Sequence, residues 1–421
     1  MSEPHASNGE GAPLPSTRGI RTAALYFPVL NARGGAERLT LVMALELAKA
    51  GVQTTIFAAQ AAPAAEIESD LGESIDSIAI ETLPGPRRLP RLRAVRQAVI
   101  DRAEGAAIRA RRPDLFINCD YRSSLPGSGR LNVFYCHFPH ELRIDTGNPV
   151  RRAYFWVVEI ARRVFVDRNA RGSLETYRQI WANSRFTARN VERMWGRTTQ
   201  VVYPPCDMIT PLAKERLIIA VGRFQAGRGP GVPHKSQEYL IDVFRGLTDL
   251  HTAGWRLLLL GGAAGEDTSF VAALREQSAG LPIDIWVNPS RAEIMESVGA
   301  ASIFWHAQGV DGDAARHPHS QEHFGISTVE AMSAGALPLV YGAAGPAEIL
   351  EPVEGLVPWQ DRDQLRNETR RLAALPTAEK EALERQCIAR ARDFDRDHFA
   401  GRLRSLLGLA RASVTTGRSD S

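Results

Sequence analysis

Two carboxylates and a glycine-marked helix start stand out in the stretch from Gln321 to Gly335. Glu322 lies in a polar loop, and Glu330 lies eight residues later on the first turns of a helix that is predicted to begin near Gly325. A helix N-terminus directs backbone N–H groups and a positive dipole end at one point, which suits a phosphate. Taken alone, the stretch fits a phosphate site and an ordinary helix start with an acidic first turn equally well.

Two basic residues of different kinds follow a predicted strand at 217–221. Arg223 comes directly after this strand, within Gly222-Arg223-Phe224, and Lys235 follows twelve residues later. Lysine is rare in this chain, which has 47 arginines and four lysines. A fork-shaped guanidinium and a compact ammonium together suit a diphosphate. Either residue alone would be interpreted as an ordinary surface charge.

A glycine pair, Gly34-Gly35, follows the first predicted strand at 22–29 and precedes a predicted helix at 36–50. A β-branched-rich strand at 52–58 completes a βαβ unit, which indicates a parallel sheet covered by helices. Glycines allow the backbone to approach a ligand closely at the carboxyl end of a strand, where open α/β sheets bind ligands. The pair does not form the GxGxxG dinucleotide motif, so its signal is weak alone.

The remaining pattern predicts two α/β halves. Further strands are predicted at 114–119, 131–138, 181–183 and 199–203, and then at 217–221, 256–260, 283–287, 302–305 and 337–340. A chain of 421 residues is too long for one ordinary core, and the Pro-containing segment from Tyr203 to Pro211 is typical of a linker. We therefore expect two doubly wound, Rossmann-like domains that face each other across a cleft. The expected boundaries are 20–205 with a returning C-terminal helix at 395–412, then 206–394, with disordered tails at 1–19 and 413–421.

Composition excludes several classes of protein. The chain is 44% hydrophobic and 24% charged, as in ordinary globular proteins. No apolar run reaches the ~18 residues of a membrane span, and the N-terminus lacks the apolar region of a secretory signal. Four scattered cysteines without a CxxC pair fit reduced thiols. We therefore expect a cytoplasmic protein.

Charge is unevenly distributed. Residues 1–205 hold 28 Lys and Arg against 20 Asp and Glu, whereas the remainder holds 23 against 28. Nine arginines lie in Arg87–Arg112, and seven lie in Arg143–Arg171 among aromatic and apolar residues. These stretches fit either a solvated helix face or peripheral contact with an anionic membrane. For a cytoplasmic protein, that contact would be with the inner face of the membrane. Nucleic acid is disfavoured, because no recognised nucleic-acid motif accompanies the charge.

In their order and spacing, these motifs resemble family 4 of the retaining glycosyltransferases, which have the GT-B fold. The motifs are Gly34 to Arg38 after a strand, Gly222-Arg223-Phe224 with Lys235, and Glu322-x7-Glu330 within EHFGISTVEAMSAG. The EHFGI form and the triplet His137-Phe138-Pro139 are similar to the branch of the α-1,2-mannosyltransferase that extends the lipid-linked N-glycan precursor. The resemblance covers the chain from about residue 20. The set of motifs is specific for the family but gives little information about the substrate.

The resemblance implies a role for each matching residue. His137 and Glu322 would act at the reacting centre, Arg223 and Lys235 would bind the donor diphosphate, and Glu330 would hold the ribose. The glycine pair would face the donor phosphate, the loop before the helix would lie beside sugar and phosphates, and the strand end at Val287-Asn288 would seat the base. The implied donor-binding residues are Gly34, Gly35, Arg223, Lys235, Val287, Glu322, His323, Phe324, Gly325, Ile326, Ser327 and Glu330.

One departure from the family pattern is the insertion-like loop Gln308 to Ser320, which carries Asp311, Asp313, His317 and His319. Its spacings do not match a closed zinc site, so a loop that covers the donor or is simply solvated is favoured. The resemblance implies metal-independent chemistry with no cofactor, the nucleotide sugar being a co-substrate.

The sequence therefore favours a retaining hexosyltransferase. Its donor would be a nucleotide-diphosphate sugar, with GDP-mannose slightly favoured over a UDP-sugar, and its acceptor a hydroxyl of a glycan, lipid-linked or small-molecule acceptor. Two alternatives stay open: a GT-B sugar epimerase or phosphorylase, and a non-catalytic module that binds nucleotide sugars.

Overall fold

A computed structural model gives the structure of the chain. It describes residues 19–30, 34–83, 85, 93–121, 123–140, 170–227, 232–342 and 344–410, together with 153, 156, 157 and 160. Both predicted tails lie outside the described residues, apart from residue 19, as do residues 31–33, residues 86–92 and most of Arg143–Arg171.

Seven parallel strands form the N-terminal sheet, in the order β5-β3-β1-β6-β7-β8-β9. These strands are β1 Thr22–Tyr26, β3 Gln53–Ala58, β5 Ala79–Thr82, β6 Leu115–Asn118, β7 Leu131–Cys136, β8 Gln179–Ala182 and β9 Gln200–Val201. A separate short pair joins β2 Val29–Leu30 to β4 Gln60–Ala61. The helices of this half are α1 Gly35–Lys49, α2 Ala64–Leu71, α3 Arg93–Ala110, α5 Ala170–Leu174 and α6 Arg185–Trp195.

Five parallel strands form the C-terminal sheet, in the order β12-β11-β10-β13-β14. They are β10 Glu215–Val221, β11 Arg256–Gly261, β12 Ile283–Val287, β13 Ala301–His306 and β14 Leu337–Val340. The helices are α7 Gln237–Arg245, α8 Thr248–Thr252, α9 Thr268–Gln277, α10 Arg291–Ala300, α11 Ile326–Ser333, α12 Gly345–Leu350, α13 Arg362–Ala373 and α14 Thr377–Arg392, with short 3-10 turns at Gly265–Asp267 and Pro318–Ser320.

Helices cover both faces of each sheet, so the strands are apolar on both sides. Leu25 packs with residues of α1 and α2, whereas Tyr26, the next residue of β1, packs with residues of α3 and α6. In the same way, Ile218 of β10 packs with α7 and α13, and Leu217 packs with α10. Strands buried on both faces give the continuous apolar runs from which the parallel sheets were predicted. The predicted fold class is confirmed.

Some predicted boundaries were wrong. The strand predicted at 22–29 ends at Tyr26, and the chain resumes as β2 after Pro28, which cannot donate a hydrogen bond to a ladder. Likewise, β9 is only two residues long and ends before Tyr203-Pro204. The edge strand β5 was missed because none of its residues is buried, which leaves no apolar run to recognise.

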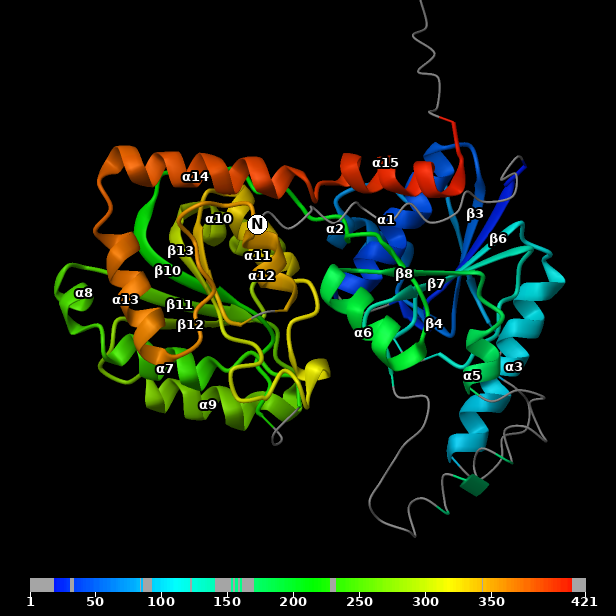
Figure 1. Ribbon diagram of the computed structural model, residues 1–421, viewed down its shortest axis with the longest axis horizontal. Helices are drawn as coiled ribbons and strands as arrows, with labels where there is room; N and C mark the ends of the chain where they lie inside the picture. Colours follow the sequence, from blue (N-terminus) through cyan, green and yellow to red (C-terminus); the bar gives the residue numbers. More distant parts are fainter. Residues whose placement is uncertain are drawn as a thin grey trace, which may run out of the picture.

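The chain passes between the two halves at two adjacent places. The first crossing is the linker at Cys206, and the second lies between α14 and α15 Arg396–Leu407, which follow each other along one side of both halves (Figure 1). The amide of Cys206 donates to the carbonyl oxygen of Phe394 at 2.9 Å, so the two crossings lie side by side. Phe399, Leu403 and Leu407 of α15 are buried against the N-terminal sheet.

Among the described residues, no helix is long and apolar enough to cross a membrane.

Candidate active site

The two halves meet at the glycine pair and the start of α11. A Cβ on Gly35 would lie 2.6 Å from Cδ1 of Ile326, the first residue of α11, and a Cβ on Gly34 would overlap the carboxylate of Glu37. A real Cβ does not come this close to another atom, so a side chain at either position would displace its neighbour. The start of α1 at Gly35 therefore lies against the helix that carries Glu330.

The start of α11 is shaped by Gly325, which has a φ of 106° and serves as the N-cap residue. This left-handed conformation strains any residue with a Cβ, so glycine is needed at the turn. The helix begins at Ile326, and the first amides of a helix, here those of Ile326 and Ser327, have no intrahelical partner. The turn thus presents backbone donors and the positive dipole end where the sequence predicted them.

Hydrogen bonds from both halves fix the loop before α11. Ser184 Oγ, from the N-terminal half, donates to the carbonyl oxygen of His323 at 2.6 Å. The amide of Gly345 donates to the carbonyl oxygen of Glu322 at 3.0 Å. Phe324 is 3% exposed and belongs to the core of the C-terminal half. The loop backbone is therefore held in place by the protein's own contacts.

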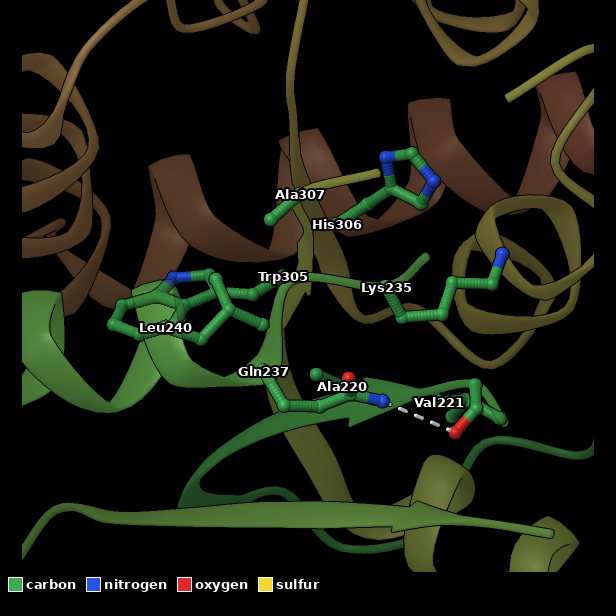
Figure 2. A pocket seen from close by; sticks show the side chains of 9 residues that line it. Ala220, Val221, Lys235, Gln237, Leu240, Trp305, His306 and Ala307 are labelled. Carbon is green, nitrogen blue, oxygen red and sulfur yellow. Dashed lines mark hydrogen bonds between the residues drawn. The ribbon is translucent and has the colours of Figure 1, made fainter. Parts of the chain in front are cut away.

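Lys235 and Glu322 form an ion pair between Nζ and Oε2, and His306 Nε2 lies 3.4 Å from the same carboxylate oxygen. Burial opposes the ionisation of Glu322, but Lys235 and His306 outweigh it and hold the pKa of this carboxyl below its ordinary range. Burial also lowers the pKa of His306, which favours its neutral form. Figure 2 shows Lys235 and His306 in the lining of a small pocket beside β10 and β13. The structure thus joins Lys235 to Glu322 and adds His306 to them.

Arg223 is exposed at the start of the loop after β10. It lies close enough to Glu37 of α1 to influence that carboxyl: burial raises the pKa of Glu37, and Arg223 partly offsets this rise. In the described part of the chain, the side chain of Arg223 has no hydrogen bond or ion pair, whereas its backbone carbonyl accepts a hydrogen bond from Gln237 Nε2 at 3.0 Å. Its guanidinium is therefore available for an anionic ligand at the junction of the halves.

His137 lies in the N-terminal half beside the same junction. It is 6% exposed, its Nε2 is 2.9 Å from the carbonyl oxygen of Cys119, and its ring stacks on Tyr121 with 4.3 Å between centroids. Burial lowers the pKa of His137 to about 4, so the imidazole is neutral near pH 7. Tyr121 is half-exposed. Burial and the charges of Glu37 and Glu322 raise the pKa of its hydroxyl, so Tyr121 lies near charged groups of both halves.

Glu330 is on the second turn of α11 and is 8% exposed. Its Oε1 accepts a hydrogen bond from Arg291 at 2.5 Å, and Arg291 also contacts Asp207 of the linker at 2.7 Å. Burial raises the pKa of the Glu330 carboxyl, although Arg291 opposes this rise. Glu330, the residue predicted to bind the ribose, is therefore already paired with an arginine of the protein.

Val287 ends β12, next to Asn288, which has a positive φ of 54°. The side-chain oxygen of Asn288 accepts from the backbone amide of Ala263 at 2.9 Å, and the backbone amide of Asn288 donates to the carbonyl oxygen of Gly261 at 2.9 Å. These bonds join the carboxyl ends of β11 and β12, so the two strand ends form one surface.

The two aspartates of the insertion-like loop at 308–320 are bonded to other groups of the protein. Asp311 lies 3.1 Å from His234 Nε2 and 3.2 Å from Ser236 Oγ, and Asp313 accepts from the amides of Ala315 and Arg316. Within the described residues, no group of three or more His, Cys, Asp or Glu side chains is arranged to hold a metal ion.

Solved structures similar to this chain share its whole architecture. The HepE protein of Anabaena, in complex with UDP and glucose, has a TM-score of 0.62 at 16% identity, over 93% of this chain and 100% of that chain. Sucrose-phosphate synthase from Thermosynechococcus elongatus has a TM-score of 0.65 at 17% identity, over 92% and 98%. At these identities the likeness shows the fold, which is the GT-B fold of glycosyltransferases.

Two sequence-family models also place the chain among the glycosyltransferases. Residues 33–208 match Glycosyltransferase Family 4, and residues 210–394 match Glycosyl transferases group 1. The chain belongs to glycosyltransferase family 4, a retaining family that transfers sugars from nucleotide sugars.

Curated relatives match over a shorter region. The GDP-Man:Man(3)GlcNAc(2)-PP-Dol alpha-1,2-mannosyltransferase of Xenopus laevis is 30% identical over 194 residues, which is 42% of this chain and 36% of that protein. The Homo sapiens protein of the same name is 29% identical over 197 residues, with the same coverage. The match thus spans about a third of the length of these relatives.

Sequence reasoning missed four residues of the site. His306 ends a buried strand, and a polar residue at that position was a usable signal. Tyr121, Glu37 and Arg291 gave no local signal, because each becomes notable only through a contact with a distant segment.

Proposed function

We propose that this protein is a retaining hexosyltransferase that uses a nucleotide-diphosphate sugar and is independent of metal. The observation that carries the proposal is the ion pair of Lys235 and Glu322 at the loop leading into α11, with His306 on the same carboxylate oxygen. A cation and a helix N-terminus beside a carboxylate can bind a diphosphate and a sugar hydroxyl together.

In this proposal the donor lies along the start of α11. Arg223, whose guanidinium has no hydrogen bond or ion pair among the described residues, and Lys235 bind the diphosphate. The backbone from His323 to Ser327 lies beside the sugar and phosphates, with Gly34-Gly35 facing a phosphate. Glu322 binds hydroxyls of the transferred sugar and Glu330 the ribose, while the strand end at Val287 seats the base.

Cleavage of the anomeric C–O bond places negative charge on the departing diphosphate and positive charge on the sugar ring. Fixed cations and backbone N–H groups stabilise the departing diphosphate, because they need no reorganisation during the reaction. The acceptor hydroxyl enters on the same face beside the leaving phosphate: its oxygen bonds the anomeric carbon and its proton passes to the departing phosphate oxygen, which retains the anomeric configuration. His137, neutral in its buried position, lies at the reacting centre as an uncharged group.

GDP-mannose is the favoured donor because the curated relatives carry GDP-mannose in their names, and a UDP-sugar is the second choice. The acceptor is a glycan, lipid-linked or small-molecule hydroxyl. The N-terminal half (20–205 with 395–412) is proposed as the acceptor side, and residues 206–394 as the donor side. A peripheral contact with an anionic membrane fits the exposed Trp156, Val157 and Ile160, which are 67%, 53% and 41% exposed.

A panel of nucleotide sugars, scored first by thermal shift, tests the proposal. A donor at 100 times its Kd should stabilise the fold by about 2.7 kcal/mol. The donor that binds is then assayed for release of nucleoside diphosphate with candidate acceptors. Glu322→Gln should lose turnover, whereas the exposed Glu354→Gln should not.

The outcomes separate the three classes. Acceptor-dependent release of nucleoside diphosphate supports the transferase. Interconversion of sugars, or phosphorolysis of a glycan, would instead support an epimerase or phosphorylase. A thermal shift without turnover would support a binding module.

A further inference from the structure

Four charged side chains form three successive ion pairs, which run from the N-terminal half to the buried carboxylate of α11. Arg38 of α1 contacts Asp207 of the linker at 2.7 Å. Asp207 in turn contacts Arg291 at 2.7 Å, and Arg291 contacts Glu330 at 2.5 Å. A single nitrogen of Arg291, Nη2, bonds both carboxylates. The last carboxylate thus depends on Arg291 for its charged partner.

The backbone around this chain of charges is itself fixed. The amide of Ile209, two residues after Asp207, donates to Ser333 Oγ at 2.8 Å. Ser333 Oγ donates to the carbonyl oxygen of Glu330 at 2.7 Å. The linker carrying Asp207 is therefore attached to the helix that carries Glu330, so the position of Arg291 between the two carboxylates is determined by the fold.

Arg291 is the first residue of α10 and follows the strand end at Val287 by four residues. The segment that follows β12, where we propose that the base binds, therefore also supplies the arginine that pairs with Glu330. Only Oε1 of Glu330 is bonded to Arg291, and Oε2 has no hydrogen bond in the part of the chain that the structure describes. One carboxylate oxygen is held by the protein, which leaves the other for a ligand.

We propose that Arg291 is a positioning residue for nucleotide recognition: it orients Glu330 so that Oε2 accepts hydrogen bonds from the ribose hydroxyls of the donor. Asp207 holds Arg291 from the other side, and Arg38 connects this arrangement to the helix that begins at the glycine pair. The inference rests on the proposed function, in which Glu330 binds ribose.

Binding of nucleotides with and without ribose hydroxyls provides the test. Calorimetry compares GDP with 2′,3′-dideoxy-GDP, and UDP with 2′,3′-dideoxy-UDP, on the full chain. The wild type should prefer the ribonucleotide roughly tenfold, as expected for a hydrogen bond to a charged group. Arg291→Met should bind the ribonucleotide roughly tenfold more weakly and lose this preference, because Glu330 is no longer oriented.

Three further variants keep the test decisive. Arg291→Lys should recover only part of the preference, since lysine keeps the charge but carries it on a shorter side chain with different donor geometry. Asp207→Asn retains Arg291 and should reduce the preference, which covers the case in which Arg291→Met does not fold. Arg256→Met removes an exposed arginine that pairs with Glu215 at 2.7 Å and should change neither affinity.

A preference that persists in folded Arg291→Met would overturn the inference and leave the proposed function standing. Tighter ribonucleotide binding by this variant would also overturn it, because Arg291 would then compete with the ribose for Glu330. If the wild type binds neither GDP nor UDP, the proposed function fails and the inference fails with it.

Discussion

Replacing Lys235 by methionine tests the proposed donor site directly. The substitution keeps an unbranched side chain that is one atom shorter and removes the charge that pairs with Glu322. If Lys235 stabilises the departing diphosphate, the loss of one such group should raise the barrier by about 3 kcal/mol, or ~100-fold in kcat. The same change should also lower the stability of the fold, because Glu322 loses its charged partner and keeps only His306 as its neighbour.

The expected loss of stability follows from the burial of the pair. The side chains of Lys235 and Glu322 are 25% and 19% exposed, so the cost should be roughly 2 kcal/mol, below the 3–5 kcal/mol of a fully buried pair. Burial opposes ionisation of Glu322, but the charge of Lys235 and the hydrogen bond with His306 dominate and lower its pKa. The ionised form therefore stabilises the fold at pH values above 4.5, the ordinary pKa of this group. This stability is lost as pH falls towards the folded pKa. The difference in Tm between wild type and variant should therefore be greatest near neutral pH and narrow in acid.

The assay combines nucleoside-diphosphate release with thermal melting of Lys235→Met and of the double variant Lys235→Met/Glu322→Gln. The double variant should recover Tm, because no unpaired carboxylate remains, but should stay inactive. Gly222→Ala is a second perturbation: its Cβ would lie 2.6 Å from Cγ of Lys235 and should displace the lysine without removing its charge. Near-normal turnover by folded Lys235→Met would refute the role of Lys235.

Four further predictions concern other parts of the molecule. EDTA should leave turnover nearly unchanged; complete loss that Mg²⁺ or Mn²⁺ restores would contradict metal independence. Gly35→Ala should lower activity about tenfold because its Cβ would overlap Ile326, and Gly35→Ala/Ile326→Ala should recover part of it if close contact is the cause. Small-angle scattering should show a smaller radius of gyration with saturating donor, whereas an unchanged value would count against closure of the halves. Anionic liposomes should bind the protein at low salt and release it as salt rises, since charges are screened beyond a Debye length of ~8 Å at physiological salt; no binding at low salt would favour a soluble acceptor.

The sequence was sufficient for features that a short window encodes. The run at 283–287 predicted β12 correctly, because it is rich in β-branched and aromatic residues and ends before Asn288-Pro289. The helix start at Gly325 was also correct, since a glycine before an apolar helical pattern marks an N-cap. The family resemblance was confirmed, because residues 33–208 and 210–394 match the models of Glycosyltransferase Family 4 and Glycosyl transferases group 1.

Contacts between distant segments could not be predicted in this way. Nothing near Glu330 in the sequence indicates that Arg291 neutralises it, because the two residues are 39 positions apart and meet only when α10 and α11 pack. For the same reason, the stacking of Tyr121 on His137 depends on the neighbouring ends of β6 and β7. Local patterns identify groups that can bind a ligand, whereas the fold decides which of them are already paired.

The two adjacent crossings limit how this protein can be recombined with its relatives. Because α15 packs on the N-terminal sheet after the chain has completed the C-terminal one, a chimera cut only at the linker would carry a foreign α15 against a native sheet. The foreign residues at the positions of Phe399, Leu403 and Leu407, which are buried here, would then have to fit a sheet with which they did not evolve. Exchange of the C-terminal half therefore needs two junctions, one near Cys206 and one near Phe394, where a hydrogen bond already joins the segments.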